Sequence, residues 1–392
     1  MVTVSIVEDG ALMIFARTIA SVVSSIESSI ARSTSVGGLS VLLWLLALSP
    51  AAALEMRVAI ESDISEVKVG SSTPATVKDG TGRVLGQLDG MNAFLAVSGH
   101  NQIALSHWQA SQMWIEPGEG GFVYIGDRWY RGRTKLVLAD GKLTAVNYVD
   151  LEEYLYSVVG AEMSPSWPSE ALKAQAVAAR SYALYQRKHR GTDTYDVGDD
   201  TFWQVYVGTD KEDPNTIAAV NATRGEILSY NGEVIEAVFH ASSGGHTEDV
   251  EQIWQEPKPY LRGVPDYDGN APVYQWNETF SSGELSDRIS GVGTVDEMLP
   301  DRTTPHGRVI SMTVIGSGGS RSVEGEDVRR ALNLRSTLFT VTAQGDSFNI
   351  SGRGFGHGVG MSQWGAKGMA DGGYNYRQIL GHYYPNTNLI GL

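Results

Sequence analysis

One carboxyl group stands out as a candidate for acid–base chemistry: Glu162, within the segment GAEMSPSWPSEALKAQAVAARSYALY that begins at Gly160. It lies in a turn rich in Met, Pro and Trp, before a long alanine-rich helix predicted from Pro168 to about His189. Met163 and Trp167 should exclude water from the carboxyl group, and such desolvation raises a carboxyl pKa toward the working pH. Most glutamates are solvated, so this local pattern alone favours an ordinary helix-flanking carboxylate.

A second candidate segment, GRGFGHGVGMSQWGA, has five glycines between Gly352 and Gly360. Glycines at this density permit positive φ and let a ligand approach backbone N–H groups closely. The segment lacks the Lys-Ser/Thr ending of a phosphate loop, which argues against nucleotide binding. His357 is either a sugar contact, a group that orients Glu162, or a structural histidine held by the backbone. The candidate saccharide contacts of this segment are His357, Gly358, Ser362 and Gln363.

The segment HASSGGHTE is a candidate for another wall of the same site. Its candidate contacts are His240, Ser242, Ser243 and Gly244. Ser243 lacks the G-x-S-x-G elbow of serine hydrolases, so a Ser/His/Asp triad is disfavoured. Asp266, in VPDYD, is the runner-up for a second catalytic carboxylate, but a turn-forming role after proline is the preferred interpretation.

Several segments of the chain resemble the SpoIID/LytB family. They are the Glu162 segment, GRGFGHGVGMSQWGA, HASSGGHTE, DTFWQVYVGT, TRGEILSYNGEVIEAVF, PYLRGVPD and QILGHYYPNT. This is the stage II sporulation protein D and amidase-enhancer group. The resemblance extends from about Val146 to the end of the chain, with weaker similarity back to about Arg57. The family's catalytic glutamate falls in a Glu-Met pair, which Glu162-Met163 matches. Ser164 occupies the position where many members have proline.

The resemblance implies an enzyme, a peptidoglycan lytic transglycosylase that cleaves glycan strands, with a preference for denuded ones, and leaves 1,6-anhydro-muramyl ends. Such an enzyme uses the C6 hydroxyl of N-acetylmuramic acid as nucleophile, so one Glu can replace the usual pair of glycosidase carboxylates. Gln204 and Tyr206, in the family's Gln-Val-Tyr motif, join the candidate substrate contacts. The alternative is a non-catalytic wall-binding protein that enhances an N-acetylmuramoyl-L-alanine amidase. The expected partners are therefore glycan strands and possibly a cell-wall amidase.

Some members of the family carry Cys and His just before the Gln-Val-Tyr motif, where zinc can bind. Here those positions are Thr201, Phe202 and Trp203, and the chain contains no cysteine. His240 and His246 lack an obvious third ligand. We therefore expect no metal site and no cofactor.

The N-terminus predicts export to the periplasm or cell wall. The apolar run Leu39–Leu48 is too short for a comfortable membrane span and is followed by Ser49-Pro50 and then by three alanines ending at Ala53. Residues 1–53 therefore form a predicted signal peptide with an unusually long n-region; an uncleaved membrane anchor is the alternative. The formal net charge of −15 argues against nucleic acid and anionic membrane surfaces as partners.

The elements that must position these residues predict an α+β fold. Short alternating strands punctuated by Gly, Asn and Asp predict a small antiparallel β module over residues 54–145. It precedes a SpoIID/LytB-like catalytic domain, residues 146–392, with the alanine-rich helix as its core and strands around it. Another helix should begin at Asp150, with Glu153 completing a capping box, and end at Gly160 before the Glu162 turn. Shorter helices are expected at 327–334 and 376–383.

Overall fold

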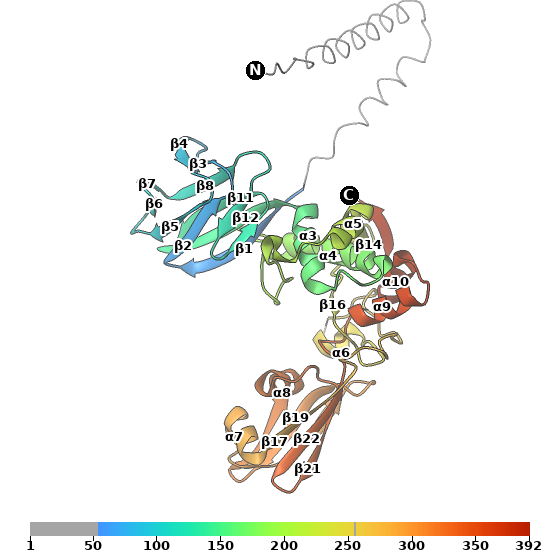
Figure 1. The fold of residues 1–392 in the computed structure, drawn as a ribbon. Coiled ribbons are helices and arrows are strands. Elements are labelled where there is room, and N and C mark those ends of the chain that lie inside the picture. The colour runs from blue at the N-terminus through green and yellow to red at the C-terminus, as the bar shows by residue number, and fades with distance from the viewer. Residues whose placement is uncertain (1–53, 255) are drawn as a thin grey trace, which may run out of the picture. The chain divides into compact units, whose positions relative to one another are not determined.

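The computed structural model describes residues 54–254 and 256–392 (Figure 1). The predicted signal peptide, residues 1–53, lies outside the described residues, so export and cleavage after Ala53 stay predictions. Within the described ranges, no helix is both long and apolar enough to cross a membrane. Helices and strands alternate irregularly along the chain, which confirms the α+β class.

The first described hundred residues form two sheets that share one hydrophobic core. Their strands are β1 (Glu55–Ile64), β2 (Glu66–Ser71), β3 (Ala75–Asp79), β4 (Val84–Leu88), β5 (Asn92–Ser98), β6 (Ile103–Leu105), β7 (Trp108–Ala110), β8 (Gln112–Pro117), β9 (Val123–Ile125), β10 (Arg128–Tyr130), β11 (Arg133–Ala139) and β12 (Lys142–Asp150). The orders are β13-β1-β12-β11-β8-β3-β4 and β10-β9-β2-β5-β6-β7, where the edge strand β13 (Val197–Gly198) comes from later in the chain. In β3 every second side chain is buried, as expected for a strand with one face on a core. Strand β12 pairs antiparallel with β1 and leads directly into the next helix.

Helix α3 (Leu151–Glu162) begins where the sequence predicts, because the Asp150 side chain accepts hydrogen bonds from the Glu152 and Glu153 N–H groups. Glu153 forms an ion pair with Arg131, so only the first half of the expected capping box is present. The predicted end at Gly160 was wrong. Gly160 instead lets the helix approach another backbone, since a Cβ there would lie 1.9 Å from the carbonyl oxygen of Lys211. The helix therefore continues to Glu162 itself.

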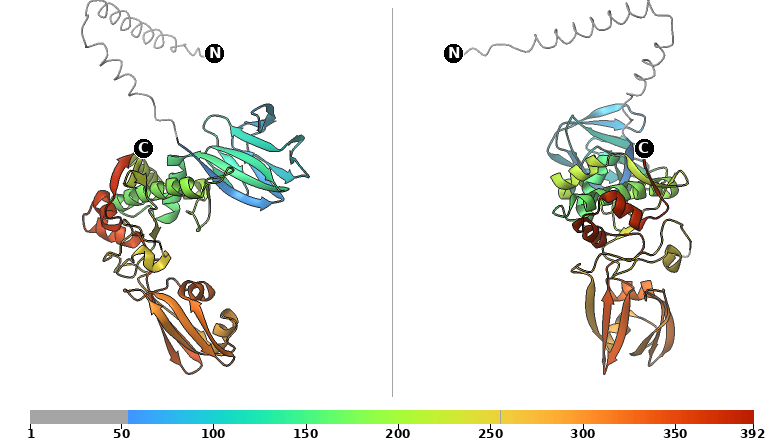
Figure 2. Two further views of the ribbon diagram at one scale, coloured as in Figure 1. Left: turned by 180° about the vertical axis from the view of Figure 1, so that it is seen from behind. Right: turned by 90° about the vertical axis from the view of Figure 1, so that its right-hand side faces the viewer.

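Helix α4 (Ser169–Arg190) is the predicted alanine-rich helix, with Pro168 as its N-cap residue rather than its first helical residue. Its alanines are buried, and their small side chains allow close helix packing. Helices α9 (Gln363–Asp371) and α10 (Tyr376–Tyr383) pack against α4, and they lie beside it in the views of Figures 1 and 2. Segments nearly two hundred residues apart in sequence thus meet in one hydrophobic core.

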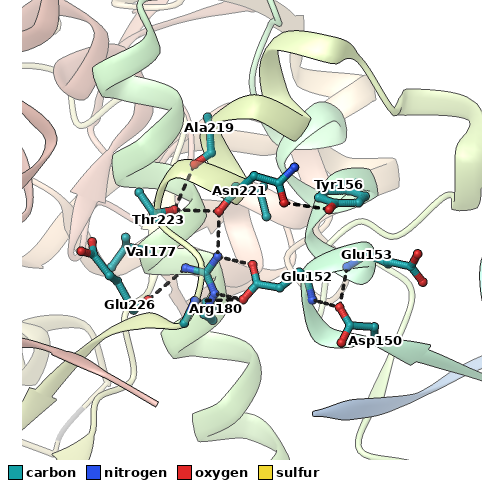
Figure 3. A network of polar contacts seen from close by, with 12 residues as sticks. Asp150, Glu152, Glu153, Tyr156, Val177, Arg180, Ala219, Asn221, Thr223 and Glu226 are labelled. Carbon is teal, nitrogen blue, oxygen red and sulfur yellow. Dashed lines mark hydrogen bonds and ion pairs between the residues drawn. The ribbon is translucent and has the colours of Figure 1, made fainter. Parts of the chain in front are cut away.

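A buried ion pair connects α3 to α4. Arg180 of α4 donates to both carboxylate oxygens of Glu152, at 3.0 Å and 2.5 Å (Figure 3). Arg180 also donates to the carbonyl oxygen of Glu226 at 2.9 Å, and Glu152 accepts from the Gly225 N–H at 3.1 Å. Both charges are fully occupied by hydrogen bonds, which a buried pair requires to be stable. The pair therefore fixes α3, whose last residue is Glu162, to α4 and to strand β14 (Glu226–Tyr230).

The remaining elements surround α4 or belong to a third core. Around α4 lie β13 (Val197–Gly198), the 3₁₀ helix η1 (Gly208–Lys211), α5 (Pro214–Ala222), β14 (Glu226–Tyr230), β15 (Glu233–Val234), β16 (Phe239–His240), α6 (Val250–Trp254), β23 (Met361–Ser362) and β24 (Asn388–Gly391). The third core comprises β17 (Gln275–Ser281), α7 (Ser282–Arg288), β18 (Val295–Thr303), β19 (Val309–Gly316), β20 (Gly319–Glu324), α8 (Gly325–Leu332), β21 (Phe339–Gln344) and β22 (Ser347–Arg353). Both short helices expected from the sequence are present, as α8 and α10. The sequence predicted one domain over residues 146–392, and this third core was not predicted as a separate part of it.

Candidate active-site cleft

Glu162 lies in the wall of a cleft of about 840 Å³. The lining comes from α4, the loop at 201–205, β16, α6, the glycine-rich segment at 355–357, and the first residue of α9. Of the residues proposed from the sequence, the cleft brings together Glu162, His240, His357 and Gln363. These four come from segments that are up to about two hundred residues apart, so only folding places them around one space.

The Glu162 carboxylate is held by two hydrogen bonds. Its Oε2 accepts from the Gln363 Nε2 at 3.1 Å, and its Oε1 accepts from the Val205 N–H at a long 3.4 Å. Burial raises the pKa of Glu162, and these two hydrogen bonds oppose that rise because they favour the ionised form. Met163 is buried beside it and Trp167 packs against the same core, which agrees with the desolvation expected from the sequence. The net result is a carboxyl group with a raised pKa on the rigid end of a helix.

Gln363 owes its position to the start of α9. The Ser362 side chain caps the helix by accepting from the Gly365 N–H at 3.1 Å, and the Trp364 N–H donates to the Ala241 carbonyl oxygen at 3.0 Å. Just before the helix, β23 pairs in parallel with β16. Gln363 is therefore the first residue of a capped helix anchored to the strand that carries His240, which aims its amide at Glu162.

Both cleft histidines are neutral, each for a structural reason. The Val359 N–H donates to His357 Nδ1 at 3.1 Å, so His357 carries its proton on Nε2 and donates it to the Phe239 carbonyl oxygen at 3.0 Å. Burial lowers the pKa of His357 to about 3. His240 donates from Nδ1 to the Val359 carbonyl oxygen at 3.1 Å, and burial lowers its pKa well below the ordinary value. His357 is thus committed to backbone on both nitrogens, whereas His240 keeps an acceptor on Nε2.

The other sequence candidates do not line the cleft: Gln204, Tyr206, Ser242, Ser243, Gly244, Gly358 and Ser362. Gln204 and Tyr206 are buried, and the Tyr206 hydroxyl donates to Asn147 at 2.7 Å. Gly358, with φ of 80°, lies so close to the buried Arg308 that a Cβ would come within 2.3 Å of its guanidinium. These residues lie outside the cleft lining.

A pair of aspartates holds the Ser242–Gly244 turn. The Ser243 hydroxyl donates to Asp266 at 2.5 Å, and the Ser242 hydroxyl donates to Asp268 at the same distance. Asp266 also accepts from the Tyr383 hydroxyl at 2.6 Å, and Asp268 accepts from the Gly244 N–H at 2.8 Å. Asp266 does not line the cleft, and both its oxygens are already used. The preferred interpretation of Asp266 as a turn residue agrees with this geometry.

Two features of the cleft were not predicted from the sequence. Glu236 and Glu256 are further carboxylates in the lining; Glu236 is paired with Lys258, whose Nζ donates to it at 2.6 Å, and Glu256 is exposed. The exposed aromatic side chains of Phe202, Trp254 and Phe355 also line the cleft. The Glu236–Lys258 pair has no local sequence signal, but the aromatic residue Phe202 beside the Gln-Val-Tyr motif was a signal available in the sequence.

No zinc-type cluster occurs in the part of the chain that the structure describes, where groups of three or more His, Asp or Glu side chains in ligating arrangement are absent. Thr201, Phe202 and Trp203, none of which carries a thiolate or imidazole, line the cleft. The donor set present here does not fit a thiolate zinc site.

The fold and site define a class: an α+β protein whose cleft presents one desolvated glutamate between an alanine-rich helix and a glycine-rich C-terminal segment. Residues 139–230 match the family described as SpoIID, Stage II sporulation protein, and residues 265–360 match a domain of unknown function. The second match covers the third hydrophobic core.

Three similar proteins match this chain over longer ranges than the family model does. The stage II sporulation protein D of Bacillus subtilis is 35% identical over 265 residues, covering 62% of this chain and 76% of that protein. An uncharacterized protein of Brachyspira hyodysenteriae is 35% identical over 280 residues, covering 69% and 75%. The amidase enhancer of Bacillus subtilis is 33% identical over 290 residues, covering 60% and 40%. The chain therefore belongs to the SpoIID/LytB family, as its motifs predict.

Proposed function

We propose that this chain is an exported peptidoglycan-remodelling enzyme, a lytic transglycosylase in which Glu162 is the single acid–base group. The observation that carries the proposal is Glu162 itself. It lies in the wall of a cleft, its pKa is raised by burial, and it belongs to the family's Glu-Met pair. A raised pKa keeps a larger fraction of the carboxyl protonated near neutral pH, which a general acid requires.

The proposed reaction consumes no water. The Glu162 carboxyl donates its proton to the glycosidic oxygen, and the C1–O bond of the muramic acid residue breaks with its electron pair on that oxygen. The C6 hydroxyl of the same residue then bonds to C1, and its proton returns to the Glu162 carboxylate. The products are a strand with a free hydroxyl and a strand with a 1,6-anhydro end. Gln363 and the Val205 N–H hold the carboxylate between the two proton transfers.

The competing mechanism is hydrolysis by two catalytic carboxylates. Two further carboxylates line the same cleft: Glu236, which is ion-paired with Lys258, and Glu256, which is exposed. In this proposal the Glu236–Lys258 ion pair supports the architecture of the cleft, and Glu162 alone exchanges the proton with the substrate.

The test is mass spectrometry of the products from denuded and intact glycan strands. The Glu162→Gln variant should lose about 10²–10⁴-fold in rate, the usual cost of losing general acid–base help. Glu236→Gln and Glu256→Gln should each keep anhydro products. Reducing ends in place of anhydro ends, or loss of activity in either of these two variants, would contradict the single-carboxylate mechanism.

The relative named amidase enhancer supports a second candidate function, that of a non-catalytic protein that stimulates a cell-wall amidase. The same samples distinguish the two. If the wild-type chain forms no anhydro ends, and both it and Glu162→Gln accelerate stem-peptide release by a purified N-acetylmuramoyl-L-alanine amidase, the enhancer function replaces the enzyme.

A further inference from the structure

Three aromatic side chains remain exposed within the Glu162 cleft: Phe202 at 65%, Trp254 at 43% and Phe355 at 43% of their surface. They come from three separate segments, the loop after β13, the end of α6 and the glycine-rich segment. Exposed aromatic surface is costly in water, and its concentration in one concave site marks a binding surface. Neither the acid–base mechanism nor the core uses these rings.

The loop that carries Phe202 is fixed rather than loose. The Asp200 side chain accepts from the Phe202 N–H at 2.9 Å, and the Asp200 carbonyl oxygen accepts from the Trp203 N–H at 3.0 Å. The Trp203 ring packs over Gly198, where a Cβ would lie 2.8 Å from it. Trp203 therefore packs on Gly198 within the lining, and Phe202 is left exposed.

The other two rings are also held in place. The Trp254 ring lies 4.9 Å from the ring of His357, which is itself fixed by backbone on both nitrogens. Phe355 exchanges two backbone hydrogen bonds with Ser242, at 3.0 Å and 2.7 Å. Platforms that are ordered before binding cost little conformational entropy when a ligand stacks on them.

Two buried acceptors accompany the rings. His240 carries its proton on Nδ1, so Nε2 has a lone pair, and no donor reaches it among the described residues. The Gln186 amide donates to Glu236 at 3.5 Å, and its Oε1 likewise has no donor within the described ranges. Both side chains line the cleft. Such groups require O–H or N–H donors, because an unpaired buried acceptor is unfavourable.

We propose that this aromatic arm of the cleft, Phe202, Trp254 and Phe355, stacks on further sugar residues of the glycan strand beyond the two at the scissile bond. A pyranose ring offers an apolar C–H face for an aromatic platform, and its hydroxyl and acetamido groups supply the donors that His240 and Gln186 lack. A lipid chain would leave those acceptors unpaired. The cleft volume of about 840 Å³ is near the top of the usual range, about 300–1,000 Å³, and leaves room for more than a disaccharide. The inference rests on the proposed function, and it makes the enzyme selective for strands of at least four sugars.

The test measures binding instead of cleavage. Full-length Glu162→Gln protein is titrated calorimetrically with the di-, tetra- and hexasaccharides of β-1,4-linked N-acetylglucosamine. The hexasaccharide should bind more tightly than the disaccharide. Phe202→Ala and Trp254→Ala should each weaken hexasaccharide binding by at least about fivefold, as expected for the loss of an anchoring aromatic contact, and leave disaccharide binding unchanged.

Tyr267→Ala is the matched control, because Tyr267 is an aromatic residue exposed to 46% that does not line the cleft. Unchanged melting temperatures would show that all three variants fold. Equal affinity for di- and hexasaccharide, or no effect of both arm substitutions, would overturn the inference while leaving the Glu162 mechanism intact. Phe202-dependent binding of a sugar-free stem peptide, without hexasaccharide binding, would overturn it in favour of a peptide site. Failure of the wild type to form anhydro ends would reject the proposed function but leave this binding result readable.

Discussion

Replacing Gln363 by Met should raise the pKa of Glu162, because it removes the donor at 3.1 Å while keeping the length of the side chain. A hydrogen bond to a charged group contributes about 1.5–3 kcal/mol, and one pKa unit corresponds to about 1.36 kcal/mol. Glu162 is only partly buried, so we take the lower end of that range. The expected shift is about one pKa unit upward, on top of the rise that burial already causes.

The sign of the kinetic effect follows from the proposed role. Glu162 acts as an acid in its protonated form, so kcat/KM should fall as the pH rises through its pKa. In Gln363→Met that basic limb should move about one unit to higher pH. Carboxyl ¹³C NMR of the free protein measures the same pKa without substrate, and the resonance is assigned by its absence in Glu162→Gln.

Gln344→Met is the control, since Gln344 is exposed and does not line the cleft. An unchanged NMR titration in Gln363→Met would show that this amide does not hold the carboxylate. A shift to lower pH would show that Gln363 stabilises the protonated form, and the reasoning above would be refuted.

Four further outcomes are expected. Because its pKa is raised in the folded state, Glu162 destabilises the fold as the pH rises through that pKa; the melting temperature of Glu162→Gln should therefore exceed that of the wild type more at pH 8 than at pH 4. Arg180→Met, which leaves the Glu152 carboxylate buried without its partner, should lower the free energy of unfolding by about 3–5 kcal/mol in denaturant titrations, and adding Glu152→Met should restore part of that loss. Chelation should leave melting temperature and activity unchanged, and zinc that is stoichiometric and lost together with activity would contradict this. N-terminal sequencing of the exported protein should begin at Leu54, whereas an intact membrane-bound N-terminus would favour an anchor.

Local sequence patterns predicted the elements well wherever local physics decides them. Asp150 is an N-cap because its side chain reaches the first free N–H groups of the helix, and the capped helix α10 begins where expected. The end of α3 was mispredicted because Gly160 serves a tertiary contact with Lys211, which is distant in sequence. A glycine at a helix end and a glycine at a close backbone approach have the same local pattern.

In the candidate site too, some features were predicted from the sequence and others are known only from the fold. The family motifs led to Glu162, and the apolar Met163 and Trp167, both within five residues of it in the chain, predicted the direction of its pKa shift. The partner of its carboxylate, Gln363, was named only as a sugar contact, since 201 residues separate the two. His240 and His357 were indistinguishable by sequence, yet their different backbone partners leave only His240 with a free acceptor.

The sequence by itself determined the family, the α+β class, Glu162 as the candidate acid and the absence of cysteine, because each depends on residue identity and short-range order. The tertiary structure decided which candidates share one cleft, that Asp266 supports a turn, that Glu236 is paired with Lys258, and that Phe202 faces the cleft beside Glu162. Those outcomes depend on distances between segments far apart in the chain. Such distances are set by the packing of α4 against α3, α9 and α10, and no local pattern of residues encodes them.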